Sequence, residues 1–460
     1  MAKECLKFIR YLIFLIISAH SYASDLLAVF QKAVESDPTY LEVVEETLAN
    51  EENIAINRSV LLPNVSAQVF GRKDFFRSKG ASTDNDILPP KSIFTTFQPQ
   101  LSVSQTIFNF AHLAKLHGAQ LSAKQANAKL NVAFQNLLIR VAQAYFNVLQ
   151  DEDNLRYHRA SKQSFAKQLY QARQLQQAGK ATLTDVYTAE SAYGTAKSGY
   201  INAKTKLAID KDFLTTITGE YINNLAKLKL NFPLISPKPQ KINEWVNTAK
   251  QQNWDIKANL YGLQAARELI KQNVSENLPD LKLRLSSLYN TSNSTGSSFL
   301  AAPGTSKKTD NVVAINLNIP IVSGGLTVAK TRQAQFKYKA AYQNLENSYR
   351  NTVFSTRKNY LNIVADIGKL KNDIITLKSA KSSLHGLKTR YNAGSGNIVD
   401  VLIQQEKVLK AQSENAANKY SYIMNYLSLK QSIGTLSITD LHIVNSWLIT
   451  EKISKKLIDK

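Results

Sequence analysis

Few residues in this chain are spaced in a way that supports catalysis or metal binding. The six histidines are scattered, and the closest pair, His112 and His117, has no carboxylate between its members to act as a base, which indicates a solvated helix face. The glycines of 394–396 (GSG) lack the preceding strand and the spacing of a nucleotide-binding loop. A single cysteine excludes a disulfide framework and a cysteine-based zinc site. We therefore expect no enzyme, no cofactor and no metal centre.

Two carboxylates stand at matching places in the two halves of the chain. Asp185 follows the Ala-Gly pair at 178–179, and Asp400 follows the Ala-Gly pair at 393–394. A carboxylate near the start of a helix interacts favourably with the helix dipole, so a purely structural role is one explanation for both. Their repetition indicates that the elements that carry the two carboxylates are themselves repeated.

The pattern around these carboxylates is part of a tandem duplication. Three further pairs of short motifs recur in the same order at an offset of about 215 residues, and each half is far larger than a solenoid repeat. The pairs are Leu62-Pro63 with Leu278-Pro279, Ile107-Phe108 with Ile321-Val322, and Ile217-Thr218-Gly219 with Ser432-Ile433-Gly434. One domain has therefore been duplicated.

The first residues predict export. Lys3, Lys7 and Arg10 precede the apolar run 11–19, which is too short to span a bilayer as a helix. Small residues at 21 and 23 favour cleavage before Ser24, so residues 1–23 are predicted to be a secretory signal peptide, with a membrane anchor as the alternative. Cleavage removes the only cysteine and leaves a formal charge of about +20.

Composition limits the class of protein. The chain has 460 residues, 44% of them hydrophobic and 20% charged, which excludes a disordered chain and a bundle of membrane helices. Only 17 glycines and 11 prolines indicate long regular elements with few turns. The 57 basic and 35 acidic residues would suit phosphate contacts, but the lysines are spread along helices and export argues against nucleic acid. Anionic cargo and a general preference for lysine both remain as explanations.

Four segments with period-two alternation predict β-strands. They cover 63–71 and 97–108, and the runs that start at 281 and 313. Each is about nine to eleven residues long, the length of a tilted transmembrane strand. Polar segments at 72–94 and 290–310 predict long exposed loops within each pair. Along 281–285 the alternation directs Lys282 and Arg284 to a barrel lumen and the leucines to lipid.

Long helices with a coiled-coil seam follow each strand pair. Apolar residues recur at steps that average 3.5 over 130–148, 186–217 and 363–377. A helical stretch of about 65 residues would reach roughly 100 Å. The proline-rich segment 229–241 breaks this pattern, so we expect a small irregular subdomain at 221–257.

Together these elements predict a mixed α/β membrane protein. A four-stranded sheet has open edges that lipid cannot satisfy, so three chains are expected to close a 12-stranded β-barrel, continued by a long α-helical coiled-coil barrel. The expected order is the signal peptide, a first structural repeat over 24–228, an equatorial linker over 229–257, a second repeat over 258–445 and a C-terminal tail over 446–460.

A set of short motifs occurs in order along the mature chain. They are Asp37-Pro38, Leu61-Leu62-Pro63, Ile319-Pro320-Ile321-Val322-Ser323-Gly324-Gly325, Tyr391-Asn392-Ala393-Gly394, Ile398-Val399-Asp400-Val401-Leu402 and Ile433-Gly434-Thr435-Leu436. In this order they resemble the TolC family of outer-membrane efflux and secretion channels over 24–445. The resemblance implies a homotrimer in outer-membrane lipid with its helices in the periplasm, exporting drugs, proteins or both. Implied partners are a periplasmic adaptor (membrane fusion) protein and an inner-membrane RND or ABC transporter.

The resemblance also implies a gate at the periplasmic tip, with departures from the family pattern. Asp400 matches the first of two carboxylate rings, which would bind cations, but Ile403 stands where the second is expected. Tyr391 matches one side of a lock whose other side is a Thr-Asp pair, here Thr184 and Asp185. The arginine of that lock is replaced by Gly396, so a more easily opened pore is expected.

The two helix–helix turns are expected to form the tips that receive the adaptor. Gly179 and Lys180 form the first turn, and Gly394 and Ser395 form the second. Glycine ends a helix without the steric cost of a Cβ atom, which explains the turns, whereas the adaptor is implied by the resemblance alone.

The alternative function is that of an exported coiled-coil adhesin or scaffold without a pore. The four strands of lipid length are the feature that disfavours it.

Overall fold

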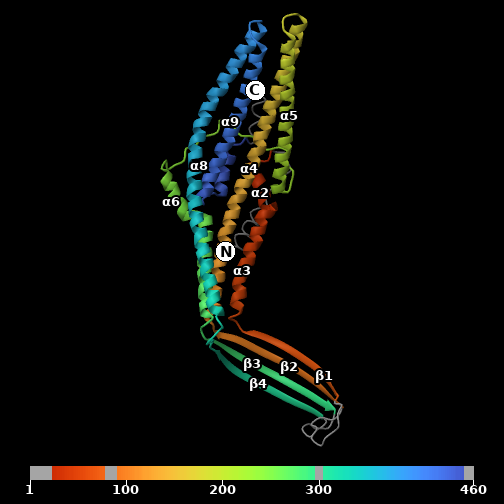
Figure 1. The fold of residues 1–460 in the computed structure, drawn as a ribbon, viewed down its shortest axis with the longest axis vertical. Helices are drawn as coiled ribbons and strands as arrows, with labels where there is room; N and C mark the ends of the chain where they lie inside the picture. Colours follow the sequence, from red (N-terminus) through yellow and green to blue (C-terminus); the bar gives the residue numbers. More distant parts are fainter. Residues whose placement is uncertain (1–22, 78–90, 230, 296–303, 450–460) are drawn as a thin grey trace. The chain divides into compact units, whose positions relative to one another are not determined.

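The computed structural model describes residues 23–77, 91–229, 231–295 and 304–449 (Figure 1). The expected signal peptide therefore lies outside the described residues, apart from Ala23. Among the described helices, none is long and apolar enough to cross a membrane.

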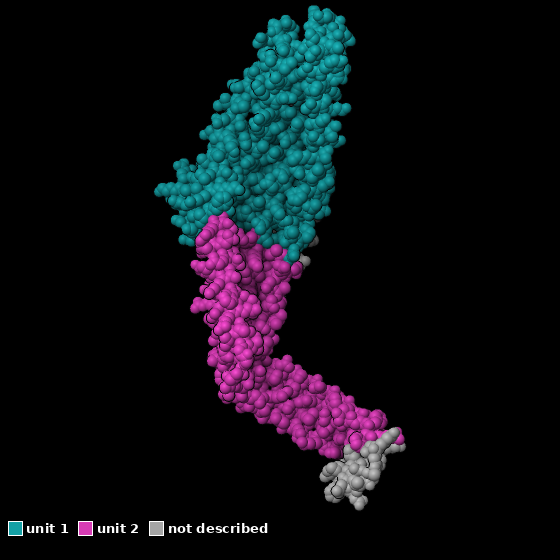
Figure 2. All heavy atoms as spheres, in the orientation of Figure 1, with its two compact units in different colours: residues 1–42, 133–253, 352–460 teal, residues 43–132, 254–351 magenta. Residues whose placement is uncertain are grey.

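The chain forms two compact units, each built from segments distant in sequence (Figure 2). Unit 1 comprises residues 1–42, 133–253 and 352–460, and unit 2 comprises 43–132 and 254–351. The two halves of the sequence contribute equivalent segments to each unit, as expected for a duplicated domain.

The helices repeat in kind and length between the two halves. The first half has α2 (Leu26–Ser36), α3 (Pro38–Ser59), α4 (Phe110–Gln177) and α5 (Leu183–Thr218); the second has α6 (Ile242–Gln252), α7 (Trp254–Ser275), α8 (Leu326–Asn392) and α9 (Ile398–Ser432), followed by α10 (Ile438–Asn445). The long helices α4 and α8 have 68 and 67 residues, and α5 and α9 have 36 and 35. These lengths support the tandem duplication.

Unit 2 holds a four-stranded antiparallel sheet in the order β1-β2-β3-β4, which confirms the predicted strand number. The strands are β1 (Asn64–Arg77), β2 (Lys91–Phe108), β3 (Asp280–Thr295) and β4 (Gly304–Asn318). The middle pair β2–β3 joins the two halves of the sequence. Within the described chain the outer edges of β1 and β4 carry no further strand.

The register separates an apolar face of the sheet from a polar one. Val65, Val103, Leu285 and Val313 lie opposite one another across all four strands. The neighbouring row is Asn64, Ser104, Arg284 and Ala314. Because successive side chains point to opposite faces, these two rows define opposite sides of the sheet.

The strands are longer than the sequence pattern predicts, and the connecting segments are correspondingly shorter than 72–94 and 290–310. The four strands have 14, 18, 16 and 15 residues. The added residues start with polar pairs, Arg72 with Thr96 and Lys73 with Thr95, but further along Phe75 pairs with Ile93. The polar pair at Lys73 and Thr95 interrupts the alternation, so the prediction stopped before the apolar face ends.

The largest core of the described chain lies in unit 1. Tyr145 and Phe146 of α4 and Tyr422 of α9 are fully buried, and Val141, Ala144 and other members of the expected seam pack beside them. Helices α2 and α10 cover this core with apolar faces, including Leu26 and Leu441. Burying each large side chain contributes about 2 kcal/mol, so this core holds the helices of unit 1 together.

Part of the predicted seam does not lie in the core. Ile363 and Leu370 of α8 are buried as expected, whereas Ile374 is 65% exposed. The seam therefore leaves the chain's own core beyond Leu370, and Ile374 presents an apolar side chain to the surface.

The segment 221–257 was expected to be irregular, and only its first part is. Residues 231–241 form no helix or strand, but α6 occupies Ile242–Gln252 and α7 begins at Trp254. Prolines at 233, 237 and 239 break regular structure only locally. The expected tail also begins inside the core, because Trp447 and Leu448 are buried.

Candidate functional site

The candidate site consists of the two helix–helix turns of unit 1 and the helix ends beside them. In the turn between α4 and α5, Gly179 has φ +73° and the amide of Lys180 donates to the carbonyl of Leu175 at 2.8 Å. In the turn between α8 and α9, Gly394 has φ +75° and the amide of Ser395 donates to the carbonyl of Arg390 at 3.1 Å. Both turns are therefore the same glycine-terminated motif.

All four expected tip residues are exposed in these turns. A Cβ atom added at Gly179 or Gly394 would meet no atom within 4 Å, so space does not require glycine there. The left-handed backbone does, because other L-residues adopt it at a cost of roughly 1–2 kcal/mol.

The two carboxylates start the helices that follow these turns. Asp185 forms a capping box with Thr182: its Oδ2 accepts from the Thr182 amide and hydroxyl, each at 2.9 Å. Helix α9 is capped instead by Asn397, which accepts from the Val399 amide at 2.9 Å. Asp400 therefore does not cap α9, and its side chain is exposed in the first turn of that helix. The structural explanation therefore accounts for Asp185 better than for Asp400.

Tyr391 lies near Asp185 but is not bonded to it. The tyrosine packs with Ile398 and Val401 in an apolar cluster, and its buried hydroxyl has no hydrogen-bond partner in the described part of the chain. Burial raises the pKa of Tyr391, and the negative charge of Asp185 raises it further. The expected lock is therefore not closed within this single chain, because the Asp185 carboxylate is engaged by Thr182.

The backbone of the turn leaves space only for glycine at position 396, so the absence of the expected arginine is tied to the shape of the turn. A Cβ atom at this position would lie 2.8 Å from the Tyr391 amide nitrogen and 3.1 Å from the Arg390 carbonyl carbon. These are backbone atoms that cannot rotate away. An arginine could enter here only if the turn changed its path.

A polar layer that sequence reasoning missed joins the two helix pairs. Lys388 of α8 donates to Ser164 Oγ of α4 and to Gln405 Oε1 of α9, each at 3.2 Å. Ser164 in turn donates to Gln405 at 3.0 Å. Burial and the nearby Lys167 lower the pKa of Lys388, so its charge is disfavoured in this layer. The sequence alone does not predict this layer, because it forms only where three distant segments meet.

A shallow groove of about 510 Å³ runs between α5 and α9 beside the turns. Thr184 and Tyr187 line it from α5, and Ile403 and Glu406 line it from α9. Two of the expected gate residues, Thr184 and Ile403, therefore meet in one surface feature, whereas Asp400 and Asp185 do not line it.

The remaining residues singled out from the sequence are two basic residues of the sheet and the two histidines that were considered for catalysis. Lys282 and Arg284 lie on the polar face, opposite Thr106 and Ser104 of β2. His117 is exposed as expected, but His112 is half-buried, which corrects its assignment to a solvated face. The described ranges contain no group of His, Cys, Asp and Glu able to hold a metal ion.

Comparison with known proteins tests the resemblance. The family model described as outer membrane efflux protein matches residues 29–220 and 245–435, once in each half. The chain belongs to this family. The outer membrane efflux fold accounts for the duplicated strand pair and for the long helices that follow it.

Individual relatives agree with the family assignment. The outer membrane protein TolC of Vibrio cholerae is 31% identical, with 96% of this chain and 97% of the relative covered. The alkaline protease secretion protein AprF of Pseudomonas aeruginosa is 25% identical, with 94% and 88% covered. The solved CmeC outer membrane channel of Campylobacter jejuni has a TM-score of 0.74 at 16% identity, covering 95% of this chain and 94% of that one, and shows the same fold.

These findings confirm the predicted class. The protein is an outer-membrane efflux or secretion channel of the TolC family. The alternative of an exported scaffold without a pore finds no support among these relatives.

Proposed function

We propose that three copies of this chain form the outer-membrane exit duct of a tripartite efflux or type I secretion system. The sheet carries this proposal. Its edges at β1 and β4 are open in the single chain, and its apolar row of Val65, Val103, Leu285 and Val313 suits lipid. Closing three such sheets into one 12-stranded barrel removes every open edge.

The helices of unit 1 support assembly as well. On α8, Phe354, Leu361 and Ile375 are each at least 59% exposed and lie at heptad-compatible spacing. On α5, Tyr187, Ile201 and Ile209 are at least 52% exposed. Apolar rows of this kind are typical of helix–helix interfaces, so neighbouring copies are expected to cover them and to build the periplasmic α-helical barrel.

The oligomeric state provides the direct test. Native mass measurement and chemical cross-linking of the full chain in mild detergent should give three copies, and the assembled barrel should migrate differently before and after heating. A stable monomer with a folded sheet would contradict the proposal, because the sheet edges would then need no partner.

The polar face of the sheet is proposed to line the pore. Cysteine at position 282 should react with a water-soluble thiol reagent, and cysteine at 283 with a lipid-soluble one, because adjacent residues point to opposite faces. Labelling of the trimer in liposomes measures this, with positions 284 and 285 as a second matched pair. Equal labelling of 282 and 283 by both reagents would overturn the assignment.

The two glycine turns are proposed to receive a periplasmic adaptor, which couples the duct to an inner-membrane RND or ABC transporter. The cargo class is drugs, proteins or both. The exposed turns and the groove between α5 and α9 support this role, since both are free to accept a partner in the single chain.

Valine at Gly179 and Gly394 should impair export and leave the trimer intact. The left-handed backbone strains a β-branched residue, so both turns would change shape while the distant core stays packed. Dye accumulation in intact cells, compared with cells lacking the channel, measures export. Gly194→Ala is the control, because this helical glycine has open space around it. Normal export by the double variant would contradict docking at the turns.

A further inference from the structure

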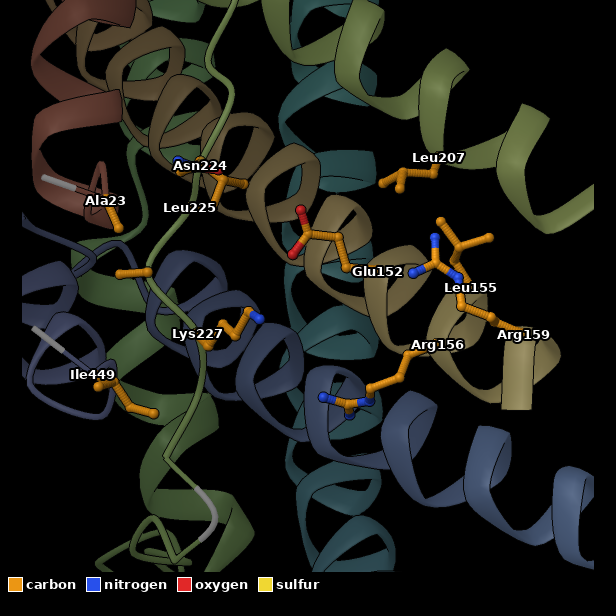
Figure 3. Close-up of a pocket in the computed structure, with 11 residues that line it drawn as sticks. Ala23, Glu152, Leu155, Arg156, Arg159, Leu207, Asn224, Leu225, Lys227 and Ile449 are labelled. Atoms are coloured by element: carbon orange, nitrogen blue, oxygen red, sulfur yellow. The ribbon is translucent and has the colours of Figure 1, made fainter. Parts of the chain in front are cut away.

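A cavity of about 670 Å³ lies in unit 1, away from the turns and from the groove beside them (Figure 3). It is bounded by α4, by α5, by the extended segment 224–227 and by the residues next to the two described ends, Ala23 and Ile449. Its volume falls within the range of about 300–1,000 Å³ that is usual for small-molecule sites.

The charged residues around this cavity leave an excess of positive charge. Three acids on α4 are already paired: Asp151 with Lys206 at 2.6 Å, Glu152 with Lys211 at 3.5 Å, and Asp153 with Arg156 at 2.6 Å. Among the described residues that line the cavity, Glu152 is the single carboxylate, and it is shared with Lys211, so it balances only part of the charge of the lining cations.

Two of those cations are Arg159 from α4 and Lys227 from the extended segment, which line the cavity from different elements (Figure 3). Neither side chain makes an ion pair or hydrogen bond with any residue that the structure describes. Lys419 lies nearby, and its pKa is lowered by burial and by the charge of Arg156, although Asp153 opposes this. The region thus favours an added anion.

The other walls are apolar. Leu155 and Leu207 face the cavity from α4 and α5, and Leu225 and Ala226 are almost completely buried behind it. A small inorganic anion would leave these walls unused. A ligand with one anionic head and an apolar body would use both kinds of surface.

We propose that this cavity binds an amphipathic carboxylate, a small molecule with one carboxylate and an apolar ring or chain. The guanidinium fork of Arg159 matches a planar carboxylate in bidentate geometry, and Lys227 supplies a second charge from the facing wall. The leucines hold the apolar body. The site is independent of export and of gating.

The test uses 2-naphthoate as the probe and the full-length protein in its native assembly, transferred from detergent to nanodiscs of zwitterionic lipid. Isothermal titration should show saturable binding of 2-naphthoate. The neutral amide 2-naphthamide should bind at least roughly tenfold more weakly, because it lacks the negative charge that Arg159 and Lys227 would pair with. Arg159→Gln and Lys227→Gln should each weaken naphthoate binding by a similar factor and leave naphthamide binding unchanged.

Lys378→Gln is the matched control, since Lys378 is an exposed lysine on α8 outside the cavity. Equal binding of acid and amide would overturn the proposal, because the cavity would then be merely apolar. An equal loss in Lys378→Gln would also overturn it, because net charge alone would explain the result. Both changed residues are exposed, so folding is expected to survive, and a normal circular dichroism spectrum verifies this.

Discussion

Asp400→Ala is expected to abolish most of the block of this channel by divalent cations and to reduce its preference for cations. In the proposed trimer, three copies of Asp400 surround the axis at the periplasmic tip. The side chain is exposed at the start of α9 and makes no ion pair within the described residues, so its full charge is available to ions. The effect should be large although the whole chain is strongly basic.

The size of the effect follows from Coulomb attraction. One carboxylate about 6 Å from a divalent cation contributes about 1.4 kcal/mol even in bulk water, so losing three should weaken the block at least roughly tenfold. Lys407 lies two helical turns further along α9, roughly 10 Å away, where salt screens most of its opposing charge. Local charge should therefore outweigh the total charge of about +20 that the cleaved chain carries.

Planar-bilayer conductance with and without added divalent cation measures this. Glu406→Ala is the matched control, because this exposed acid lies roughly 9 Å further along α9 than Asp400, away from the expected ring. Ile403→Asp should strengthen the block by adding a second ring. Unchanged block and selectivity in Asp400→Ala would show that Asp400 does not line the constriction.

Residues that the sequence did not single out join the helices near the expected gate. The expected Tyr391 lock is open in the single chain, and Gly396 leaves no space for an arginine. The observed link between the helix pairs is the Lys388 layer, in which burial disfavours the charged lysine.

What the sequence predicted well was set by periodicity and by backbone constraints. Alternation gave the four strands because each has one apolar face, and glycine marked both turns because the backbone there is left-handed. The 215-residue offset was visible because the constrained positions, such as Gly219 and Gly434, recur in each half.

The features that could not be predicted from the sequence depend on contacts between distant segments. The strands continue past Gly71 to pairs such as Phe75 with Ile93, but the polar pair of Lys73 and Thr95 in between interrupts the periodicity. Helix α6 follows a proline-rich segment, and its apolar face, with Val246 and Ala249, is short. Tyr391 matched a family position, yet its surroundings decided its bonding. Local patterns therefore predict elements, while side-chain partners require the fold.

Asp37→Ala is expected to destabilise the helical unit more than the loss of an ordinary helix cap. Asp37 is 2% exposed and accepts hydrogen bonds from Arg140 at 2.6 Å, from Thr39 and from the Tyr40 amide at 2.8 Å. It therefore caps α3 and pairs with α4 at once. Removing it leaves Arg140 without its carboxylate, and because the Arg140 side chain is 38% exposed, water offsets part of this loss. Together with the lost cap the cost is about 2 kcal/mol.

Asp25→Ala is the matched control. Asp25 caps α2 by accepting from the Ala28 amide at 2.9 Å and contacts Asn445, but it has no cationic partner in the described chain. Loss of such a cap costs about 1 kcal/mol. The apparent unfolding temperature of the trimer, followed by circular dichroism at one scan rate, should fall further for Asp37→Ala. Equal shifts would mean that the ion pair with Arg140 adds nothing.

The pH dependence separates the ion pair from the cap. Burial alone would raise the pKa of Asp37, but the hydrogen bonds from Thr39, Arg140 and Tyr40 outweigh it, so the pKa lies below its ordinary value of 3.8. A lowered pKa means that the carboxylate stabilises the fold above pH 3.8 and that this contribution is lost as the pH falls through the lowered value. The difference between the parent protein and Asp37→Ala should therefore be constant near neutral pH and shrink only below pH 3.8. A difference that shrank near pH 6 would indicate that another group, such as Asp151, whose pKa burial raises to about 6, controls the stability of this unit.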